Sequence, residues 1–300
     1  MPLPLLLAWY NEQKRDLPWR KTRNAYRIFI SELMLQQTQV DRVVPKYQKW
    51  IAAIPDWKHL AISSTQKLIN LWAGLGYNRR AVYAREAARD VMANGVPTTE
   101  EGWRTLKGVG PYMAAALTEF VNHQRAIVVD TNVRRVVGRA FSGKPFPLAK
   151  DDTQILRTLE HVTPRHGNHW DVPQAFMDLA SSLCLPRIPL CDTCPLRRAC
   201  KARHLFSPDR LAHTLARKKT VKTIEARHAE KKFPDRIYRG RILAWVRLHG
   251  KTRIEAVGPR IDGTYDPIAD RMWLKSMAQR LATDGLLRLG TGDTLSLPKS

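Results

Sequence analysis

Apolar residues recur at spacings of three and four along most of the first two hundred residues, which is the pattern of amphipathic helices. Short breakers rich in glycine and proline separate these segments, and no long alternating run indicates a large sheet. The pattern therefore predicts a mainly α-helical protein of short helices and tight turns. The clearest predicted helices cover residues 26–35, 40–53, 65–71, 80–92 and 112–121.

The composition changes after Cys200, and the chain divides into three predicted regions. We expect a helical domain over residues 1–205, a basic linker over 206–235 and a small domain over 236–300. In the last region the pattern predicts helices over 237–248, 253–257 and 270–287, then a hairpin formed by 287–289 and 294–297. Three helices followed by a hairpin favour a winged-helix-like domain, and a small helical packing domain is the alternative.

The net charge of the chain indicates what kind of molecule it binds. The 300 residues contain 50 Lys and Arg against 27 Asp and Glu, a formal net charge of +23, and such an excess predicts a polyanionic partner. No apolar run is long enough to cross a membrane. The apolar N-terminal segment is short and lacks a basic leader, so no signal peptide is predicted. We expect a monomeric, cytoplasmic protein associated with the nucleoid and with no membrane partner.

All four cysteines fall within a short stretch, at Cys184, Cys191, Cys194 and Cys200. Disulfides are not expected in a large chain in a reducing compartment, so the clustered thiols predict a metal site. Only Cys191 and Cys194 have the close spacing that zinc sites favour. The longer spacings from Cys184 to Cys191 and from Cys194 to Cys200 suit a 4Fe–4S cluster, and zinc is the alternative. Arg197 in the same loop can present a cation to DNA phosphates.

A glycine-containing turn, Lys107-Gly108-Val109-Gly110, joins two predicted helices. Two glycines with one residue between them permit a tight turn that exposes backbone N–H groups at the start of the next helix. Such a turn can bind phosphate without reading base sequence. Further along, Asp130 follows an apolar, strand-like stretch and opens a predicted helix, where it can be an N-cap, a functional carboxylate, or both.

A second carboxylate, Glu32, lies in a largely apolar predicted helix. Burial in that helix would raise the pKa of Glu32, as a general acid at neutral pH requires. A solvated glutamate without a function is the alternative. The same helix ends in the polar run Gln36-Gln37-Thr38-Gln39, whose side chains can hydrogen-bond base edges.

Together these features resemble the helix-hairpin-helix DNA glycosylases of the endonuclease III superfamily, specifically the adenine glycosylase branch. The resemblance covers residues 8 to about 203 in the order of the family. It implies a six-helix barrel packed against a helical subdomain with a 4Fe–4S cluster, and a flipped nucleotide bound between them. The stretches that carry it are 17–20, 31–40, 71–77, 106–112, 129–133, 174–179 and 184–200.

The resemblance also implies roles for the matched residues. Glu32 would protonate the departing adenine, and Asp130 would stabilise the oxocarbenium-like sugar, as paired carboxylates do in glycoside hydrolysis. Asn132 would position Asp130 and a water molecule. Tyr112 occupies the place of the lysine of the bifunctional lyases and cannot form a Schiff base, so strong strand-nicking activity is not expected.

Residues from four loops are expected to contact double-stranded DNA that contains a mispair or a damaged base. Gln37 and Tyr77 would wedge into the duplex around the lesion, and the turn at Lys107 would hold a phosphate. The expected contacts are Gln36, Gln37, Thr38, Tyr77, Asn78, Arg79, Lys107, Gly108, Val109, Gly110 and Arg197.

Two departures from the adenine glycosylase pattern concern the excised base. Adenine glycosylases usually carry a Nudix-like C-terminal domain, whereas the tail here is short, basic and winged-helix-like. Asn78 follows Tyr77 where many adenine glycosylases have a second tyrosine, and thymine mismatch glycosylases can carry asparagine there. We predict a monofunctional DNA N-glycosylase acting on adenine opposite 8-oxoguanine or guanine. The alternatives are a thymine or uracil glycosylase acting opposite guanine, a non-catalytic iron–sulfur DNA-binding protein, and a winged-helix transcription factor with a redox-sensing cluster.

Overall fold

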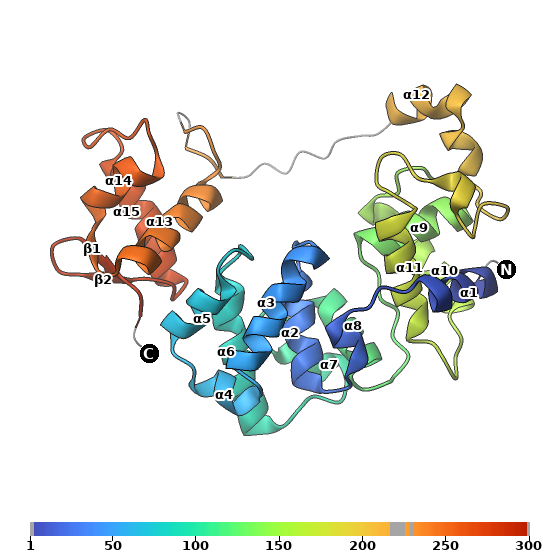
Figure 1. Cartoon of the computed structure of the whole chain (residues 1–300), viewed down its shortest axis with the longest axis horizontal. Helices are drawn as coiled ribbons and strands as arrows, with labels where there is room; N and C mark the ends of the chain where they lie inside the picture. The colour runs from blue at the N-terminus through green and yellow to red at the C-terminus, as the bar shows by residue number, and fades with distance from the viewer. Residues whose placement is uncertain (1–2, 217–225, 229–230, 299–300) are drawn as a thin grey trace. The chain divides into compact units, whose positions relative to one another are not determined.

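The computed structural model describes residues 3–216, 226–228 and 231–298, and it is mainly helical, as the hydrophobic pattern predicts (Figure 1). The five most clearly predicted helices are all present, and their bounds agree with the prediction to within two residues. The helices of the first 120 residues are α1 (Leu3–Gln13), α2 (Ala25–Leu35), α3 (Val40–Ala53), α4 (Trp57–Ile62), α5 (Thr65–Trp72), α6 (Arg79–Asn94), α7 (Glu100–Thr105) and α8 (Pro111–Phe120).

The remaining described elements include a small sheet near the C-terminus. The helices are α9 (Thr131–Ser142), α10 (Asp152–Val162), α11 (Asp171–Ser182), α12 (Pro208–Ala216), α13 (Asp235–His249), α14 (Ile254–Ile261) and α15 (Arg271–Thr283); the strands are β1 (Thr252–Arg253), β2 (Arg288–Gly290) and β3 (Thr294–Ser296). Short 3-10 turns are Pro18–Lys21, Ala149–Asp151, Cys191–Thr193 and Arg203–Phe206. The apolar stretch before Asp130 is irregular rather than a strand.

The chain forms two compact units, and each unit combines segments that are distant in sequence. The first unit contains residues 1–28, 98–105 and 109–221. The second contains residues 29–97, 106–108 and 222–300. Each unit is described by itself below.

The core of the first unit lies among α1, α9, α10 and α11. Leu6 and Tyr10 of α1 are buried against Val137 of α9 and Phe176 of α11. These helices present apolar residues at spacings of three and four, which places one stripe of each against the others. The packing holds the N-terminal helix against α11, although more than 150 residues separate them in the chain.

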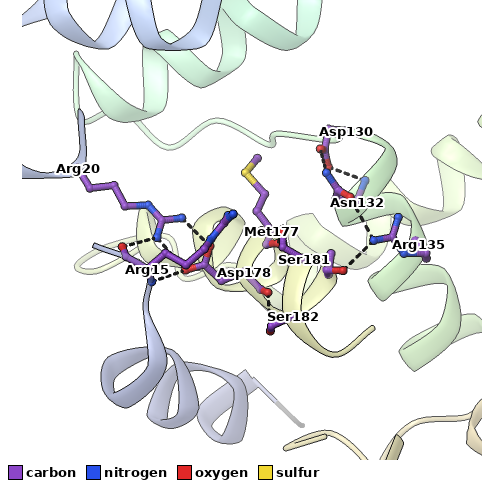
Figure 2. A network of polar contacts seen from close by, with 10 residues as sticks. Arg15, Arg20, Asp130, Asn132, Arg135, Met177, Asp178, Ser181 and Ser182 are labelled. Carbon is purple, nitrogen blue, oxygen red and sulfur yellow. Dashed lines mark hydrogen bonds and ion pairs between the residues drawn. The ribbon is translucent and has the colours of Figure 1, made fainter. Parts of the chain in front are cut away.

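A buried carboxylate fixes the segment that follows α1. Asp178 of α11 is 1% exposed and binds two guanidinium groups, those of Arg15 and Arg20 (Figure 2). The Arg20 contact is bidentate, at 2.7 and 2.9 Å, and Arg15 Nε donates at 2.7 Å. Burial alone would raise the pKa of Asp178, but the hydrogen bonds from Arg20 and the charges of both arginines outweigh it and hold that pKa below its ordinary value.

The helical part of the second unit packs around paired aromatic rings. Trp50 of α3 and Trp72 of α5 are fully buried and meet edge to face, with centroids 5.5 Å apart. Side chains accept backbone N–H groups where two of the helices begin, Asp56 at α4 and Ser64 at α5. The small residues Ala84, Ala87 and Ala88 of α6 are buried and allow α4 to lie close against that helix.

The core of the C-terminal part of the second unit is made by α13, α14, α15 and the sheet, and Ile69 of α5 and Val82 of α6 belong to the same buried cluster. Tyr238 of α13 and Trp273 of α15 meet edge to face, with centroids 4.9 Å apart. The predicted hairpin is present as β2 and β3, and β1, which the sequence did not indicate, adds a third antiparallel strand in the order β1-β3-β2. The winged-helix assignment itself stays a prediction. We call residues 231–297 the C-terminal module.

A buried lysine ties the start of this module to its loops. Lys231 is 3% exposed, and its ammonium group contacts Asp262 at 2.8 Å and Asp270 at 2.5 Å, above the ring of Trp273. Burial alone would lower the pKa of Lys231, but the hydrogen bonds to both carboxylates outweigh it and raise that pKa. The predicted basic linker therefore ends in a residue that belongs to the folded module.

The rest of the predicted linker, 206–235, is only partly described. Its first residues form α12, with Thr214 donating to the Leu205 carbonyl at 2.6 Å. Residues 217–225 and 229–230, with the lysines at 218, 219, 222, lie outside the described residues. Among the helices that are described, none has the length and apolar character needed to cross a bilayer.

We expect Asp178→Asn to destabilise the protein by about 3 kcal/mol, because it leaves two arginines without their buried counter-charge. The Tm should fall by roughly 10 °C in thermal unfolding followed by circular dichroism. The folded-state pKa of Asp178 is lowered, so its contribution is present above its ordinary value of 3.8 and is lost as the pH falls through the folded pKa. The difference in Tm between the two proteins should therefore be constant near neutral pH and shrink below about pH 4.

The matched control is Asp16→Asn, which removes the same charge from the same segment. Asp16 pairs with Lys21 on the surface, where both side chains are largely exposed. Such a pair contributes little, so its Tm should stay within a degree or two of the parent protein. Equal losses in the two variants would show that the buried contacts of Asp178 are not what stabilises the first unit.

Candidate active site and cysteine loop

A buried arginine holds two of the predicted DNA-contacting loops together within the second unit. The guanidinium group of Arg80 donates to the carbonyls of Leu33 at 2.8 Å and Gln36 at 2.6 Å, and to those of Leu75 and Gly76 at 3.2 Å each. These carbonyls belong to the end of α2 and to the turn before α6. We call residues 36–38 and 75–77 the paired loops. Burial lowers the pKa of Arg80 to about 10, which leaves it charged at neutral pH.

Each of the paired loops presents a residue with a left-handed backbone. Gln37 has a φ of 56° and Tyr77 a φ of 46°, which for residues other than glycine costs about 1 kcal/mol or more. Both side chains are exposed, Tyr77 to 52%. Thr38 Oγ1 donates to the Leu75 carbonyl at 3.3 Å and links the two loops. Strain of this kind clusters at binding sites, and both predicted wedge residues carry it. Among the described residues, His123 and Asp293 also have a left-handed backbone.

The other residues that we expect to contact DNA from this region lie in the paired loops or directly after them. Gln36 is half-buried and gives its carbonyl to Arg80, while Asn78 and Arg79 begin α6 beside Tyr77. Glu32, one turn before the loop at the end of α2, is 7% exposed. Its burial agrees with the apolar helix predicted around it.

The glycine turn between α7 and α8 is closely packed on its Gly108 side. Gly108 has a φ of 83°, and a Cβ atom there would lie 3.1 Å from the side chain of Tyr83 on α6. Both the backbone conformation and the space therefore require glycine. Lys107 is exposed with its ammonium group over the Tyr83 ring, and Gly110 precedes Pro111, the first residue of α8. Val109 is buried and anchors the turn.

The first unit holds the second predicted carboxylate. Asp130 caps α9, where its Oδ1 accepts the backbone N–H groups of Asn132 at 2.9 Å and Val133 at 2.6 Å. Its Oδ2 accepts the Asn132 side-chain amide at 2.8 Å (Figure 2). All these neighbours are N–H donors, so the carboxylate is fixed in orientation at a helix N-terminus. Tyr112 of α8 packs with Val128, two residues before Asp130.

Arg135, which sequence reasoning missed, connects Asn132 to the cysteine-bearing segment. Its guanidinium group donates to Asn132 Oδ1 at 3.1 Å and to the carbonyls of Ala180 and Cys184 at 3.0 and 2.8 Å. The signal was available, because Arg135 follows Asn132 by three residues and so lies on the same face of α9. Contacts with carbonyls from a distant segment cannot be read from that spacing.

The four cysteines line one small apolar cavity in the first unit, and none of the four is in a disulfide. Burial is the largest cause that raises the pKa of Cys191 to about 11 and of Cys194 to about 12. Cys184 lies within 3.4 Å of a guanidinium nitrogen of Arg139. The predicted DNA contact Arg197 is exposed in the same loop and donates to the Asp192 carbonyl at 2.7 Å.

The donor set suits a thiolate-bound metal group better than it suits structural thiols. Nearby backbone N–H groups, those of Leu196 and Ala202, oppose the effect of burial on the pKa of Cys194 and Cys200, as N–H groups do near metal-bound sulfurs. Within the described residues, no set of three or more His, Cys, Asp or Glu side chains is gathered closely enough to hold a single ion. A metal group of this kind binds thiolates, so its binding must release protons from the cysteines.

Comparison with known proteins shows which family has this fold and these motifs. Residues 30–165 match the HhH-GPD superfamily base excision DNA repair protein family. The chain is 39% identical over 214 residues to an adenine DNA glycosylase of Mycobacterium tuberculosis, covering 68% of each protein. It is 37% identical over 219 residues to a rat adenine DNA glycosylase but spans only 42% of that protein, and this chain spans similarly small shares of the human and mouse relatives.

Solved structures give the same fold. A thermostable thymine-DNA glycosylase superposes with a TM-score of 0.62 at 28% identity, covering 67% of this chain and 94% of that one. A trapped endonuclease III–DNA covalent intermediate superposes with a TM-score of 0.58 at 18% identity, with 67% and 93% covered. The chain therefore belongs to the HhH-GPD superfamily of base excision DNA repair proteins and, within it, to the adenine DNA glycosylase family.

Proposed function

We propose that the protein is a monofunctional DNA N-glycosylase that removes adenine mispaired with 8-oxoguanine or guanine, acting as a monomer on cellular DNA. The observation that carries the proposal is Asp130, a carboxylate held by three N–H donors at the start of α9. An N-cap needs only one or two of these contacts. The added side-chain amide of Asn132, itself held by Arg135, fixes the carboxylate more tightly than capping requires.

Two carboxylates divide the chemistry in this proposal. Glu32 is buried and donates a proton to the departing adenine, which makes the base a better leaving group. Asp130 stabilises the positive charge that develops on the sugar, and with Asn132 it orients the water that completes hydrolysis. The proposal requires both groups to reach one extruded nucleotide.

Tyr112 sets the reaction type. Its phenol offers no amine for a Schiff base with the sugar, so the reaction ends at base release and the strand is left intact. Lys107 is exposed on the glycine turn over Tyr83, where it serves a phosphate rather than the sugar. The turn from Lys107 to Gly110 thus holds the DNA backbone, and Gln37 and Tyr77 enter the duplex beside the lesion.

We further propose that Cys184, Cys191, Cys194 and Cys200 bind a 4Fe–4S cluster. The cluster supplies a rigid cross-link for residues 184–200. The chain's own contribution is to orient the sulfurs through backbone N–H groups and Arg139, and to present Arg197 to a DNA phosphate.

Thymine or uracil opposite guanine is the second candidate substrate. The observation that favours it is Asn78 after Tyr77, together with the likeness to a structure described as a thymine-DNA glycosylase. The same two carboxylates serve this reaction, so only the base-recognition step distinguishes the candidates.

A panel of duplexes tests the proposed substrate. Each duplex carries one defined pair, namely 8-oxoguanine:adenine, guanine:adenine, guanine:thymine, guanine:uracil or a normal pair. We expect base release from the two adenine mispairs, detected as strand breaks that form only after alkali treatment. Breaks without alkali would contradict the monofunctional assignment, and release of thymine or uracil alone would establish the second candidate. No release from any duplex would leave a non-catalytic DNA-binding protein.

Carboxamide substitutions test the two carboxylates. Asp130→Asn and Glu32→Gln should each slow single-turnover base release by roughly 10²–10⁴-fold while the duplex is still bound, because each keeps the shape and loses the charge or proton. Asparagine is also a good N-cap, so Asp130→Asn should fold normally. Glu101→Gln, at an exposed carboxylate of α7, is the control and should keep the full rate. A parental rate in either test variant would remove that residue from the mechanism.

The cluster is tested by metal analysis. Protein purified without oxygen should be brown and contain about four irons and four sulfides per chain. Cys194→Ser should lose most of this iron and the colour. A colourless protein that contains zinc would establish the zinc alternative instead.

A further inference from the structure

A cavity of about 690 Å³ lies within the second unit, where the helical part meets the C-terminal module. Its volume is in the range that binds one ligand or a short stretch of polymer. One wall comes from the paired loops and the start of α6, and the other from α13 and the end of α15. We call this cavity the arginine cleft; the lining residues used below are Arg42, Arg79, Arg80, Arg236, Arg239 and Asp284.

The cleft is strongly basic. Five arginines line it against one carboxylate, Asp284. Arg80 is turned inward to the paired loops, so the other four carry the charge that a ligand would meet. Asp284 is shared between Arg79 at 3.0 Å and Arg239 at 3.6 Å. One carboxylate cannot neutralise two guanidinium groups, so an anionic ligand is favoured here.

The distribution of charge within the C-terminal module also favours the cleft as the site that binds an anion. In a winged-helix arrangement the helix before the hairpin, here α15, is the usual candidate for contact with DNA. All three basic residues of α15 instead form ion pairs inside the module: Arg271 with Glu255 and Asp293, Lys275 with Asp293, and Arg280 with Asp235. The two arginines of the module that line the cleft, Arg236 and Arg239, belong instead to α13.

The cleft also continues into the predicted DNA-contacting surface. Gln37 and Tyr77, the two strained residues of the paired loops, are among its lining residues. Tyr83 also lines it and lies close to Gly108, and the ammonium group of Lys107 lies over the same ring. A DNA strand held at the paired loops and at the glycine turn therefore has this basic surface between them.

We propose that the arginine cleft binds the sugar–phosphate backbone of DNA beside the excised base, and that Arg236 and Arg239 of the C-terminal module contact its phosphates. The choice of DNA as the ligand rests on the proposed function. The module is then part of the DNA-binding surface through α13, and the basic side chains of α15 contribute no contact.

The test compares two double variants of the full-length protein with equal loss of charge. Arg236→Ala/Arg239→Ala removes the cleft arginines, and Arg271→Ala/Lys275→Ala removes two paired cations of α15. Affinity is measured by fluorescence anisotropy over a range of KCl concentrations, with a duplex containing an 8-oxoguanine:adenine pair and with the same duplex fully matched. We expect the cleft variant to bind both duplexes about tenfold more weakly, with a slope of log K against log salt that is shallower by about two. The α15 variant should match the parent protein in both respects.

Two further variants guard against a folding artefact. Arg236→Lys/Arg239→Lys keeps the charge and should restore most of the affinity and the salt slope. Arg42→Ala lies on the opposite wall, in α3, and should weaken binding without touching the module. Unchanged binding by the alanine variant of the cleft, or equal loss in the α15 variant, would overturn the proposal.

The experiment separates this proposal from the proposed function. Binding of the fully matched duplex reports on the cleft even if no base is released. Single-turnover base release at saturating protein reports on the chemistry, and there the cleft variant should stay within about threefold of the parent rate. If base release is confirmed but the two double variants bind alike, the glycosylase assignment stands and the cleft assignment fails.

Discussion

The geometry of the proposed DNA-contacting surface in the second unit depends on one guanidinium group. Arg80 donates hydrogen bonds to carbonyls at the end of α2 and in the turn before α6. These two segments are irregular, so a regular helix or sheet does not supply the donors. Buried carbonyls without partners are costly, so the two segments can adopt these conformations only while Arg80 lies between them. The exposed side chains at Gln37 and Tyr77, and one wall of the arginine cleft, are positioned by that contact.

Much of the fold could be predicted from periodicity, because most helices here bury one face and so repeat at three and four residues. Helix α3 was predicted to the residue, and the hairpin of β2 and β3 was recognised from its glycine-containing turn. Strand β1 has two residues, too few to leave an alternating pattern, and it was missed. The stretch before Asp130 is apolar and was therefore read as strand-like. In the structure it is irregular, because helices rather than a sheet bury its apolar residues.

The candidate site was predictable where chemistry depends on residue type, and not where it depends on contacts across the chain. Asp130, Gly108 and the cysteines carry signals in their own sequence neighbourhoods, whereas Arg80 and Arg135 act on carbonyls from remote segments. The same limit applies to residues 206–235, the predicted linker. Their lysines suggested a plain linker, yet Lys231 is buried on two aspartates and a tryptophan, partners that lie some thirty to forty residues later in the sequence.

The left-handed backbone at Gln37 and Tyr77 has a consequence for protein engineering. Glycine at either position would relieve the strain, so a search for thermostable variants that ignored DNA would favour it. Such variants would gain heat resistance by deleting the two side chains that we propose enter the duplex. Stability and the proposed recognition are therefore opposed at these two positions, and improved melting behaviour there would be a warning that the proposed contact has been lost.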